Sequence, residues 1–327
     1  MMEKTIKWGI VGPGNIANKF AETIKNVSGA ELTAVASRST ERGKEFAVKH
    51  QIPNVFASYE EMAESPLVDA VYVATPHPFH KPCAEIFLKS KKHVLCEKPI
   101  CVNAKQAEEL KKCADENGVF LMEAMWTRFL PAINEAVEII NSGEIGEIKA
   151  INTDFCYSIP IEEDEKVFRN NMAGGSLLDV GVYCLNFVAI FLKDNPENII
   201  SVSEIVEDVD YQTNVLMKYS NGAIASVSSA IKVNKQDMGY IYGSKGYIAL
   251  PHFYGAQELV VNIDGEERHI KKPSIGKGFE EEIIEACSCI RSGKIESDIM
   301  PMSESIRILE QMDKIREQIN LSYPFDV

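Results

Sequence analysis

The feature that most constrains the fold is the regular alternation of short apolar runs with helical patterns over the first 122 residues. Strand-like runs lie at Ile6–Val11, Leu32–Ala36, Ala70–Ala74, His93–Cys96 and Val119–Met122. Strands that are apolar throughout and alternate with helices are typical of a parallel sheet with both faces covered. The sequence therefore predicts a doubly wound α/β domain, a Rossmann sheet, over residues 1–123.

The pattern changes after Glu123. One long run of strands extends over Ile199–Ile270. Helical patterns precede it at Pro131–Asn141 and Leu177–Leu192 and follow it at Phe279–Arg291 and Ser303–Ile319. Turns such as Ser220-Asn221-Gly222 suit tight hairpins between antiparallel strands. We predict a second, α+β domain over residues 124–327, with one large, mostly antiparallel open sheet.

Charge and composition disfavour several classes of partner. The 327 residues carry a net charge of −14, which repels phosphate backbones and anionic lipids. The longest apolar helical segment, Leu177–Leu192, is interrupted by Asp179, Gly181 and Asn186, and no run reaches the roughly 20 apolar residues of a membrane span. The first residues do not have the pattern of a signal peptide. We expect a soluble protein that binds a small molecule and neither nucleic acid nor membrane.

The eight cysteines indicate the compartment. They are scattered, without a CxxC pair and without the Cys/His spacing of a zinc site. Scattered thiols in a chain of this length are typical of reduced cysteines rather than of a disulfide framework. We therefore expect a cytoplasmic protein and predict no metal site.

A glycine-rich turn follows the first strand directly. Gly12-Pro13-Gly14-Asn15-Ile16-Ala17 joins that strand to the first helical pattern, which is the context of a dinucleotide-binding fingerprint. Gly12 permits the tight turn, and Gly14 lets the backbone approach a pyrophosphate at the helix N-terminus. We assign Gly12, Gly14, Asn15 and Ile16 to cofactor binding; a plain structural turn is the alternative.

The end of the second strand predicts which dinucleotide binds. An NAD site usually carries an acidic residue about 20 residues after the glycines, where it binds the ribose 2′-hydroxyl. This chain has Ser37-Arg38-Ser39 there and no acid. Arg38 can pair with a 2′-phosphate, and the serines can donate hydrogen bonds to it. The pattern favours NADP over NAD, with Ser37 and Arg38 as ligands; a solvated loop charge is the alternative for Arg38.

The loop after the third clear strand reads Thr75-Pro76-His77-Pro78-Phe79-His80. Its position predicts that Thr75, Pro76, His77 and His80 lie at the carboxyl edge of the sheet, where cofactors bind. The two histidines have no carboxylate or thiol close by in the sequence, so contact with a cofactor or capping of the next helix is favoured over a metal pair.

Glu97-Lys98-Pro99 follows the next strand and belongs to the same edge. A residue before proline is held extended. The charge of Lys98 can steady a nicotinamide ribose or lower the pKa of a neighbouring acid. A surface loop lysine is the alternative.

Gly174-Gly175 opens a helical pattern in the second domain, and Asp179 and Tyr183 follow at positions i and i+4. That spacing predicts that both project from one face. A tyrosine near a lysine charge can donate or accept a proton in catalysis. The alternative is an aspartate favoured by the helix dipole and a core tyrosine.

Taken together, these residues resemble the Gfo/Idh/MocA family of NAD(P)-dependent oxidoreductases. The likeness covers essentially the whole chain and keeps the order of the glycine turn, Glu97-Lys98-Pro99 and Asp179-x-Gly181-x-Tyr183. Longer strings, among them Val73–His80 and Glu123–Pro131, are similar to the branch with the dimeric trans-dihydrodiol dehydrogenases and NADP-dependent D-xylose 1-dehydrogenases.

The resemblance implies roles for single residues. Lys98 would lie near the nicotinamide ribose and the substrate hydroxyl, and Tyr183 would be the acid/base. Asp179 would orient the substrate or tune the Lys98–Tyr183 pair. Many sugar-oxidising relatives have histidine where this chain has Tyr183. His80 would line the cofactor site, to which Glu97, Trp126 and Arg128 would also belong. Trp126, Arg128 and Phe129 would shape the cleft. The family also implies a homodimer formed through the open sheet of the second domain.

Two functions follow as expectations. The first is an NADP-dependent dehydrogenase acting on a CH–OH group, and the second is a non-catalytic nucleotide-sensing regulator on the same fold. The presence of Lys98, Asp179 and Tyr183 favours the enzyme. The substrate stays open between a sugar and a trans-dihydrodiol, because the aromatic candidates for its pocket suit either: Trp126, Phe129, Phe155, Tyr157 and Phe168.

Overall fold

The computed structural model describes residues 4–326 and divides the chain into two compact units. Unit 1 contains residues up to Met125 together with Ile275–Ile306, and unit 2 contains Trp126–Ser274 together with the residues from Arg307 onward. The segment 275–306 thus packs with the first unit, whereas the sequence pattern placed it in the second domain. One cause is Arg291, whose guanidinium donates to the backbone carbonyl of Gly29 at 2.9 Å.

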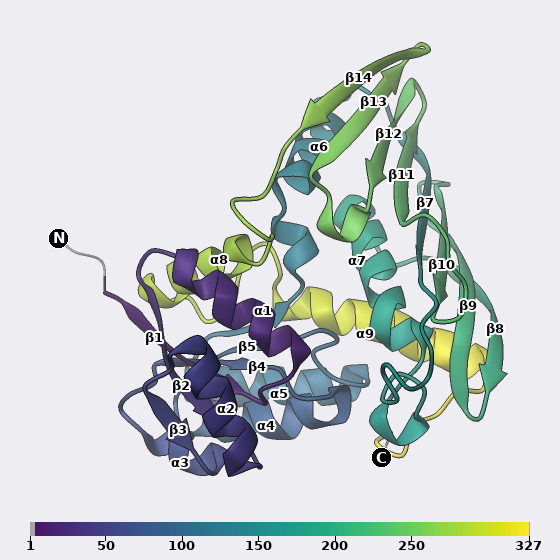
Figure 1. The fold of residues 1–327 in the computed structure, drawn as a ribbon. Helices are drawn as coiled ribbons and strands as arrows, with labels where there is room; N and C mark the ends of the chain where they lie inside the picture. Colours follow the sequence, from purple (N-terminus) through teal and green to yellow (C-terminus); the bar gives the residue numbers. More distant parts are fainter. Residues whose placement is uncertain (1–3, 327) are drawn as a thin grey trace. The chain divides into compact units, whose positions relative to one another are not determined.

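Unit 1 is built on a six-stranded parallel sheet in the order β3-β2-β1-β4-β5-β6 (Figure 1). The strands are β1 (Ile6–Val11), β2 (Ala30–Ala36), β3 (Asn54–Phe56), β4 (Ala70–Val73), β5 (His93–Glu97) and β6 (Leu121–Ala124). The helices are α1 (Asn15–Thr23), α2 (Thr40–His50), α3 (Tyr59–Glu64), α4 (His80–Lys89), α5 (Ala104–Asn117) and α8 (Glu280–Arg291). The predicted doubly wound sheet is confirmed.

Parallel pairing brings the carboxyl ends of the strands to one edge of this sheet. Val11 of β1 is paired with Ala36 of β2 and with Val73 of β4, and Val73 is paired with Cys96 of β5. The loops that follow these strands therefore start at the same level. The core of the unit contains an aromatic pair in which the Phe20 ring stacks on Tyr72, with ring centroids 3.9 Å apart.

Unit 2 is built on an eight-stranded sheet in the order β14-β13-β12-β11-β7-β10-β9-β8. The strands are β7 (Ile148–Cys156), β8 (Asn198–Val206), β9 (Val209–Lys218), β10 (Ile224–Ala230), β11 (Met238–Gly243), β12 (Gly246–Pro251), β13 (Glu258–Ile263) and β14 (Glu266–Lys271). All neighbours are antiparallel except β7 and β10, which run parallel. The predicted large, mostly antiparallel sheet is confirmed.

The strand β7 was not predicted, although it lies in the middle of the sheet. Lys149, Asn152, Thr153 and Asp154 dilute its apolar pattern. The strand forms because β10 and β11 pair with it on both sides, although its composition does not indicate a strand.

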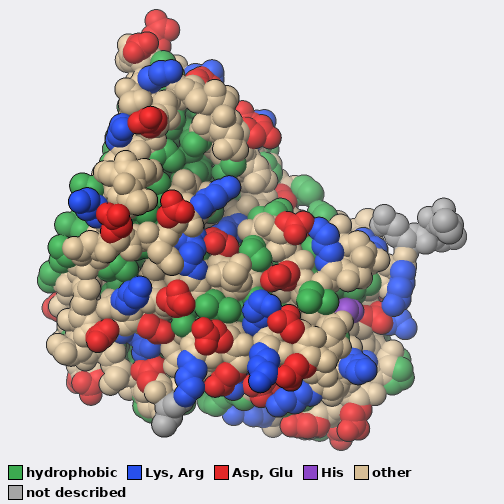
Figure 2. Space-filling model, turned by 180° about the vertical axis from the view of Figure 1, so that it is seen from behind, with side chains coloured by type: hydrophobic (Ala, Val, Ile, Leu, Met, Phe, Trp, Pro, Cys, Tyr) green, Lys and Arg blue, Asp and Glu red, His purple; other side chains and the backbone are tan. Residues whose placement is uncertain are grey.

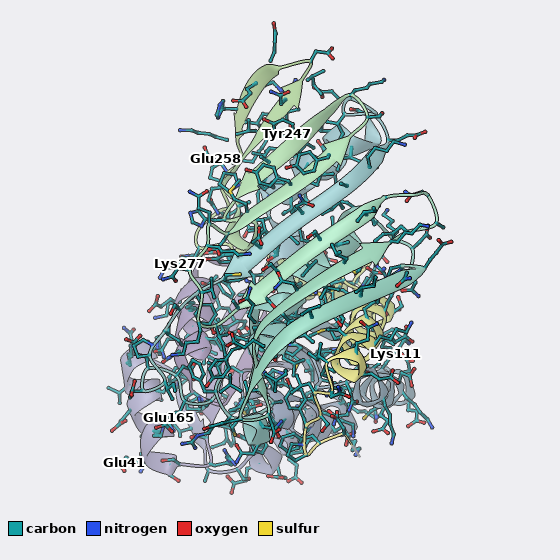
Figure 3. All side chains as sticks on the ribbon, turned by 90° about the vertical axis from the view of Figure 1, so that its right-hand side faces the viewer. Glu41, Lys111, Glu165, Tyr247, Glu258 and Lys277 are labelled. Atoms are coloured by element: carbon teal, nitrogen blue, oxygen red, sulfur yellow. The ribbon has the colours of Figure 1, made fainter. Side chains whose placement is uncertain are left out.

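Helices cover one face of this sheet. They are α6 (Pro131–Asn141), which contacts β13, and α7 (Val182–Phe191), which contacts β7 and β10; α9 (Met302–Gln318) contributes its later residues to unit 2. Figure 3 looks onto the opposite face, where side chains such as Tyr247 stand in front of the strands. Among residues 4–326 no helix covers that face in this view, so the sheet is open on that side.

One helical stretch, Asn170–Phe191, is long and apolar enough for a membrane span when only length and composition are considered. The sequence pattern did not indicate a span there, because Asp179, Gly181 and Asn186 interrupt the apolar run. In the structure 83% of its most apolar window is buried inside the chain, as in a core helix.

The surface charges are mixed. Figure 2 shows acidic and basic side chains interspersed over one face of the molecule. Several charged side chains form ion pairs one helical turn apart, such as Lys111 with Asp115 at 2.7 Å. Such exposed pairs contribute little stability each, and the net charge of −14 is not gathered in one patch on this face.

Candidate active site

The glycine-rich turn lies against the loop that follows β4. Gly12 has a φ of +87°, and a Cβ on it would come within 3.0 Å of Thr75 Cγ2. Gly14 is the N-cap residue of α1 and has no side chain with which to cap that helix. A helix N-terminus of this kind beside a glycine turn can offer N–H groups to a phosphate. The local geometry therefore suits a pyrophosphate at Gly12, Gly14, Asn15 and Ile16.

The turn after β2 places Arg38 at the same edge. Ser39 caps α2 by accepting the Arg42 N–H at 3.4 Å, and Ser37 Oγ accepts the Ser39 N–H at 3.2 Å. Arg38 is exposed, and its guanidinium carbon lies 5.2 Å from the centroid of the Phe79 ring. This cation–π contact joins the turn to the loop that carries Pro76 and His77.

His80 connects two loops from inside the protein. It is 1% exposed, with Nδ1 2.8 Å from the Pro99 carbonyl oxygen and Nε2 2.6 Å from the Thr75 carbonyl oxygen. Burial, and then the charge of His77, lower the pKa of His80 to about 3. A neutral imidazole carries one N–H, so it donates to one of these carbonyls only. Both ring nitrogens face backbone carbonyls, so His80 supports the cofactor edge from within.

Buried carboxyl groups support the loop that carries Lys98. Glu97 is buried; it accepts hydrogen bonds from the Tyr72 hydroxyl and, at 3.2 Å, from the Lys98 backbone N–H. Burial raises the pKa of Glu97. Glu123, also buried, accepts the Ile100 N–H at 3.0 Å. The predicted cofactor residue Glu97 thus braces the loop from within.

A further carboxyl in this region was not indicated by sequence patterns. Glu282 of α8 is 0% exposed, and among the described residues neither of its oxygens has a hydrogen-bond partner. Burial, and then the charge of Glu97, raise its pKa well above the usual range. A buried carboxyl without a donor is most stable in its neutral form. Within the run Glu280-Glu281-Glu282, no local signal distinguishes this residue.

In unit 2, Tyr183 belongs to a cluster of four rings that we call the aromatic group: Trp126, Phe155, Tyr183 and Tyr254. Phe155 stacks on Tyr254 with centroids 4.1 Å apart and planes 7° from parallel. The Tyr183 ring lies 5.6 Å from Phe155 and 6.0 Å from Tyr254. The indole Nε1 of Trp126 donates to the Tyr183 hydroxyl oxygen at 3.2 Å. Three members were predicted site residues, and the structure brings them together.

Tyr254 was not predicted. It lies in a short 3-10 turn, Phe253–Gly255, that follows His252 at a φ of 47°. Its backbone carbonyl accepts the Thr127 hydroxyl at 2.7 Å. No local pattern indicates this turn, because an aromatic residue after a strand is more often part of the core.

Asp179 lies in a π-helical turn, Leu177–Gly181, that leads into α7. Its carboxylate accepts the Tyr157 hydroxyl at 2.6 Å. Burial, and then the charge of Asp179, raise the pKa of Tyr157. The wider turn replaces the regular helix that the spacing of Asp179 and Tyr183 assumed. Such turns are frequent at functional sites.

Three other predicted site residues are buried within unit 2. Arg128 is buried and donates from Nε to Asn186 Oδ1 at 2.9 Å, which ties it to α7. Phe129 is buried. Phe168 packs with Val167, Val209 and Ile231 in a separate small core, outside the aromatic group. Their contact with a cofactor or substrate stays a prediction.

The turn that opens the helix of Asp179 and Tyr183 is held from two sides. Asp210 of β9, fully buried, accepts the Leu177 N–H at 2.7 Å and the Ser176 hydroxyl at 2.8 Å. Burial raises the pKa of Asp210 to about 6. On the other side the Tyr323 hydroxyl donates to the Gly174 carbonyl at 2.8 Å. Neither anchor was predicted, because both are distant in sequence from the turn.

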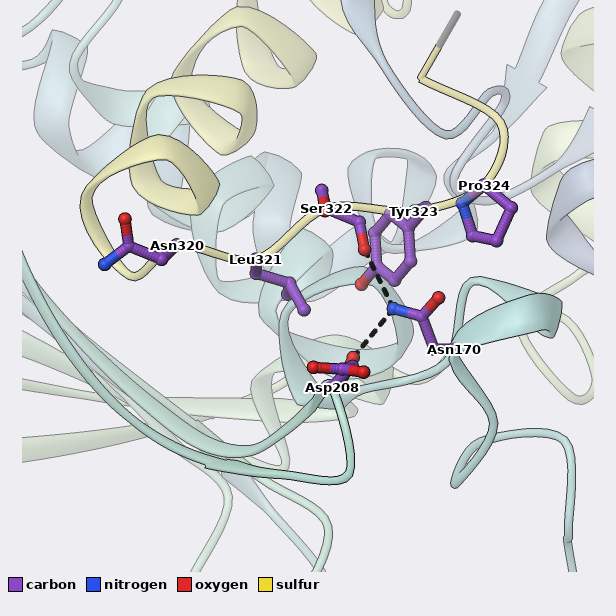
Figure 4. Close-up of a pocket in the computed structure, with 7 residues that line it drawn as sticks. All are labelled: Asn170, Asp208, Asn320, Leu321, Ser322, Tyr323 and Pro324. Atoms are coloured by element: carbon purple, nitrogen blue, oxygen red, sulfur yellow. Dashed lines mark hydrogen bonds between the residues drawn. The ribbon is translucent and has the colours of Figure 1, made fainter.

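Figure 4 shows the tail segment that carries Tyr323. Asn170 Nδ2 donates to the backbone carbonyls of Asp208 and Ser322, at 2.8 Å each. These residues line a hollow of about 360 Å³ with Asn320, Leu321 and Pro324. None of the lining residues belongs to the aromatic group, so this hollow is not the candidate active site.

Within residues 4–326, no cluster of three or more His, Cys, Asp or Glu side chains could hold a metal ion. His77 and His80 lie with ring centroids 5.8 Å apart. All eight cysteines are buried and free.

The doubly wound sheet with a glycine turn and a buried support for Lys98 defines a dinucleotide-binding protein with a second, open-sheet unit. Two family models match the sequence of this chain. Residues 6–125 match the oxidoreductase family with an NAD-binding Rossmann fold (GFO_IDH_MocA), and residues 133–249 match the GFO/IDH/MocA C-terminal domain. The chain belongs to the Gfo/Idh/MocA oxidoreductase family, as its resemblance predicted.

Individual relatives are similar over nearly the whole length. The trans-1,2-dihydrobenzene-1,2-diol dehydrogenase of Mus musculus is 37% identical, over 98% of this chain and 99% of its own. KijD10, a 3-ketoreductase from Actinomadura kijaniata solved with NADP and TDP-benzene, is 25% identical with a TM-score of 0.88, covering 97% and 98% of the two chains. The aldose-aldose oxidoreductase of Caulobacter crescentus, 23% identical, shares the fold with a TM-score of 0.89, over 97% and 98% of the chains.

We expect Gly175→Ala to destabilise the protein by about 3 kcal/mol or more, because strain and overlap act together. Gly175 has a φ of +117°, and a Cβ there would overlap Asp210 Oδ1. Gly222→Ala is the matched control, since Gly222 has a φ of +83° and an added Cβ there would point into open space. It is expected to cost about 1 kcal/mol. Urea unfolding followed by circular dichroism measures the free energy of unfolding of both variants. Equal losses of stability would contradict the role of Asp210 in holding the turn at Gly175.

Proposed function

We propose that the chain is an NADP-dependent dehydrogenase that transfers a hydride between the cofactor and a CH–OH group of a sugar or a trans-dihydrodiol. The observation that carries the proposal is Tyr183, set in the aromatic group with an N–H donor on its oxygen. The name of the mouse relative supports the diol class. The NADP in the KijD10 structure supports the cofactor.

The residues of unit 1 fit NADP. Gly12 lies where any side chain would meet Thr75 and the Ala74 carbonyl, so the turn keeps its backbone accessible. The N-terminus of α1 would hold the pyrophosphate, and Arg38 would pair with the 2′-phosphate. When bound, the nicotinamide supplies the hydride chemistry.

The proposed proton chemistry belongs to the protein. Tyr183 takes the hydroxyl proton of the substrate during oxidation and returns it during reduction. Lys98 stabilises through its charge the tyrosinate, which is the form of Tyr183 that takes this proton. Asp179, whose carboxylate already accepts the Tyr157 hydroxyl, orients the substrate hydroxyl.

The aromatic group supports a substrate with an apolar ring face. Phe155 and Tyr254 stack on each other beside the Tyr183 ring, which leaves one outer face of each ring for a substrate. Aromatic faces stack on the C–H face of a pyranose as well as on an unsaturated diol ring. We propose these two classes as substrates, and a cytoplasmic location in which the eight free cysteines stay reduced.

Formation or loss of NADPH absorbance with D-xylose, D-glucose and a trans-dihydrodiol tests the reaction. We expect turnover with NADP, and a fall in kcat of about 100-fold or more in Lys98→Met and in Tyr183→Phe. Tyr219→Phe is the matched control, because Tyr219 is a buried tyrosine outside the aromatic group whose hydroxyl contacts Met217 Sδ at 3.9 Å.

The outcomes separate the two functions. Full turnover in both variants would contradict the proposed roles of Lys98 and Tyr183. Tight NADPH binding with no turnover on any substrate would favour the nucleotide-sensing regulator.

Arg38→Ala tests the cofactor preference. Removing the guanidinium is expected to weaken NADPH binding about tenfold or more and to leave NADH binding unchanged, because only NADPH carries the 2′-phosphate. Fluorescence titration of both cofactors gives the ratio, with Lys44→Ala, an exposed cation of α2, as the control. An unchanged ratio would contradict the assignment of Arg38, and a wild type that prefers NADH would contradict NADP itself.

We also propose that two copies pair through the open face of the second sheet. Ile200, Val202, Leu216 and Ile224 of this sheet are 52–71% exposed. Ile200 is paired with Leu216, so their side chains are neighbours across β8 and β9. Further along the sheet Tyr240 and Tyr242 stack, with centroids 5.6 Å apart. Exposed apolar side chains gathered on one face of a sheet are typical of a protein interface.

Leu216→Glu is expected to weaken the dimer, because it buries a charge in the interface. Sedimentation equilibrium should show monomer at concentrations where the wild type is dimeric. Val48→Glu is the matched control, because Val48 is 81% exposed on α2 of unit 1. A dimer of unchanged affinity in Leu216→Glu would show that another surface pairs the copies.

A further inference from the structure

We propose that Trp126 is a positioning residue for the acid/base: its indole N–H holds and polarises the Tyr183 hydroxyl. The inference rests on the proposed function of Tyr183. The geometric basis is the Nε1–Oη distance of 3.2 Å. An indole N–H only donates, so the direction of this hydrogen bond is fixed, and the tyrosine oxygen is the acceptor. The donor therefore points at the atom that changes charge when Tyr183 loses its proton.

Neighbouring contacts hold the indole in place. Gly255 leaves room for it, because a Cβ there would come within 2.9 Å of Trp126 Cη2. The next residue, Thr127, donates to the Tyr254 carbonyl at 2.7 Å. Arg128 donates to Asn186, which lies three residues after Tyr183 in α7. The donor is therefore fixed before any substrate arrives, which is the condition for electrostatic preorganisation.

The side chains on the segments and elements around Tyr183 differ in what they offer a tyrosinate. Arg128 donates from Nε to Asn186, Asp179 accepts from Tyr157, and burial raises the pKa of Tyr254, which keeps its phenol neutral. From the sheet, β7 contributes the uncharged Phe155 ring, and β10 contains no charged residue. None of these residues, nor Lys98 of the proposed mechanism, is altered when only the indole is changed. A shift in the titration of Tyr183 in such a variant therefore reports the indole N–H.

The charged form of Tyr183 gains most from this donor, so removing it shifts the proton chemistry in a known direction. In the oxidation direction, kcat rises with pH as Tyr183 loses its proton. Loss of the N–H makes that proton harder to remove. The rising limb of the pH–rate profile should therefore move to higher pH.

Trp126→Phe keeps an aromatic ring and removes the N–H. We expect the rising limb to move up by about one pH unit, with kcat at neutral pH falling about tenfold, the size of a hydrogen bond to a charged group. NADPH affinity is followed by fluorescence in parallel, because Trp126 is also predicted to shape the cofactor cleft, and a loss of affinity alone would change KM without moving the limb of kcat. Tyr254→Phe changes the same aromatic group without touching the N–H, and should leave the limb in place whatever its effect on KM.

Gly255→Ala is the second variant, for the case in which Trp126→Phe folds poorly. It presses on Trp126 Cη2 and should move the limb in the same direction by a smaller amount. A limb at the wild-type pH in either folded variant would overturn the inference and leave Trp126 as a packing residue. The proposed function fails separately: if Tyr183→Phe keeps both the limb and the turnover, Tyr183 is not the acid/base.

Discussion

Parallel pairing of the strands in unit 1 is the constraint on which the cofactor edge depends. Every buried backbone N–H and C=O must find a partner, so the register cannot slip without leaving groups unpaired. With Val11, Ala36, Val73 and Cys96 level across four strands, the loops after them emerge side by side. Residues far apart in sequence then act as one edge. The cation–π contact of Arg38 with Phe79 and the bridge of His80 between two loops both follow from that register.

Unit 2 achieves positioning differently, through a buried carboxyl group. Asp210 has lost its water, which is costly, and the three donors from Ser176, Leu177 and Thr213 offset that cost. In return they fix the turn before Asp179 and Tyr183. The chemistry-bearing helix is therefore oriented by a strand on one side and by the C-terminal tail on the other. The hydrogen bonds that satisfy the buried Asp210 carboxyl group are therefore the same ones that position the turn.

Much of the site could be predicted because its signals are local. A glycine between a strand and a helix, as at Gly12, is typical of a turn at positive φ, and the lack of an acid near Arg38 is visible in the sequence alone. Residue type was a weaker guide to role. His80 and Glu97 have side chains suited to ligands, yet burial turns both inward as supports of loops. Sequence patterns indicate which residues lie near a site, and the structure adds which of them also hold loops; contact of His80 and Glu97 with a cofactor stays a prediction.

The sequence by itself determined the class of fold, the dinucleotide turn and the family, because strand and helix periodicity and short motifs are written in neighbouring residues. Only the tertiary structure decided the partners of the candidate catalytic groups. Tyr254 and Trp126 reach Tyr183 from different segments, and Asp210 and Tyr323 reach the turn before it from a strand and from the tail. Such contacts depend on how the chain closes over long distances, where packing and the pairing of buried polar groups choose the neighbours.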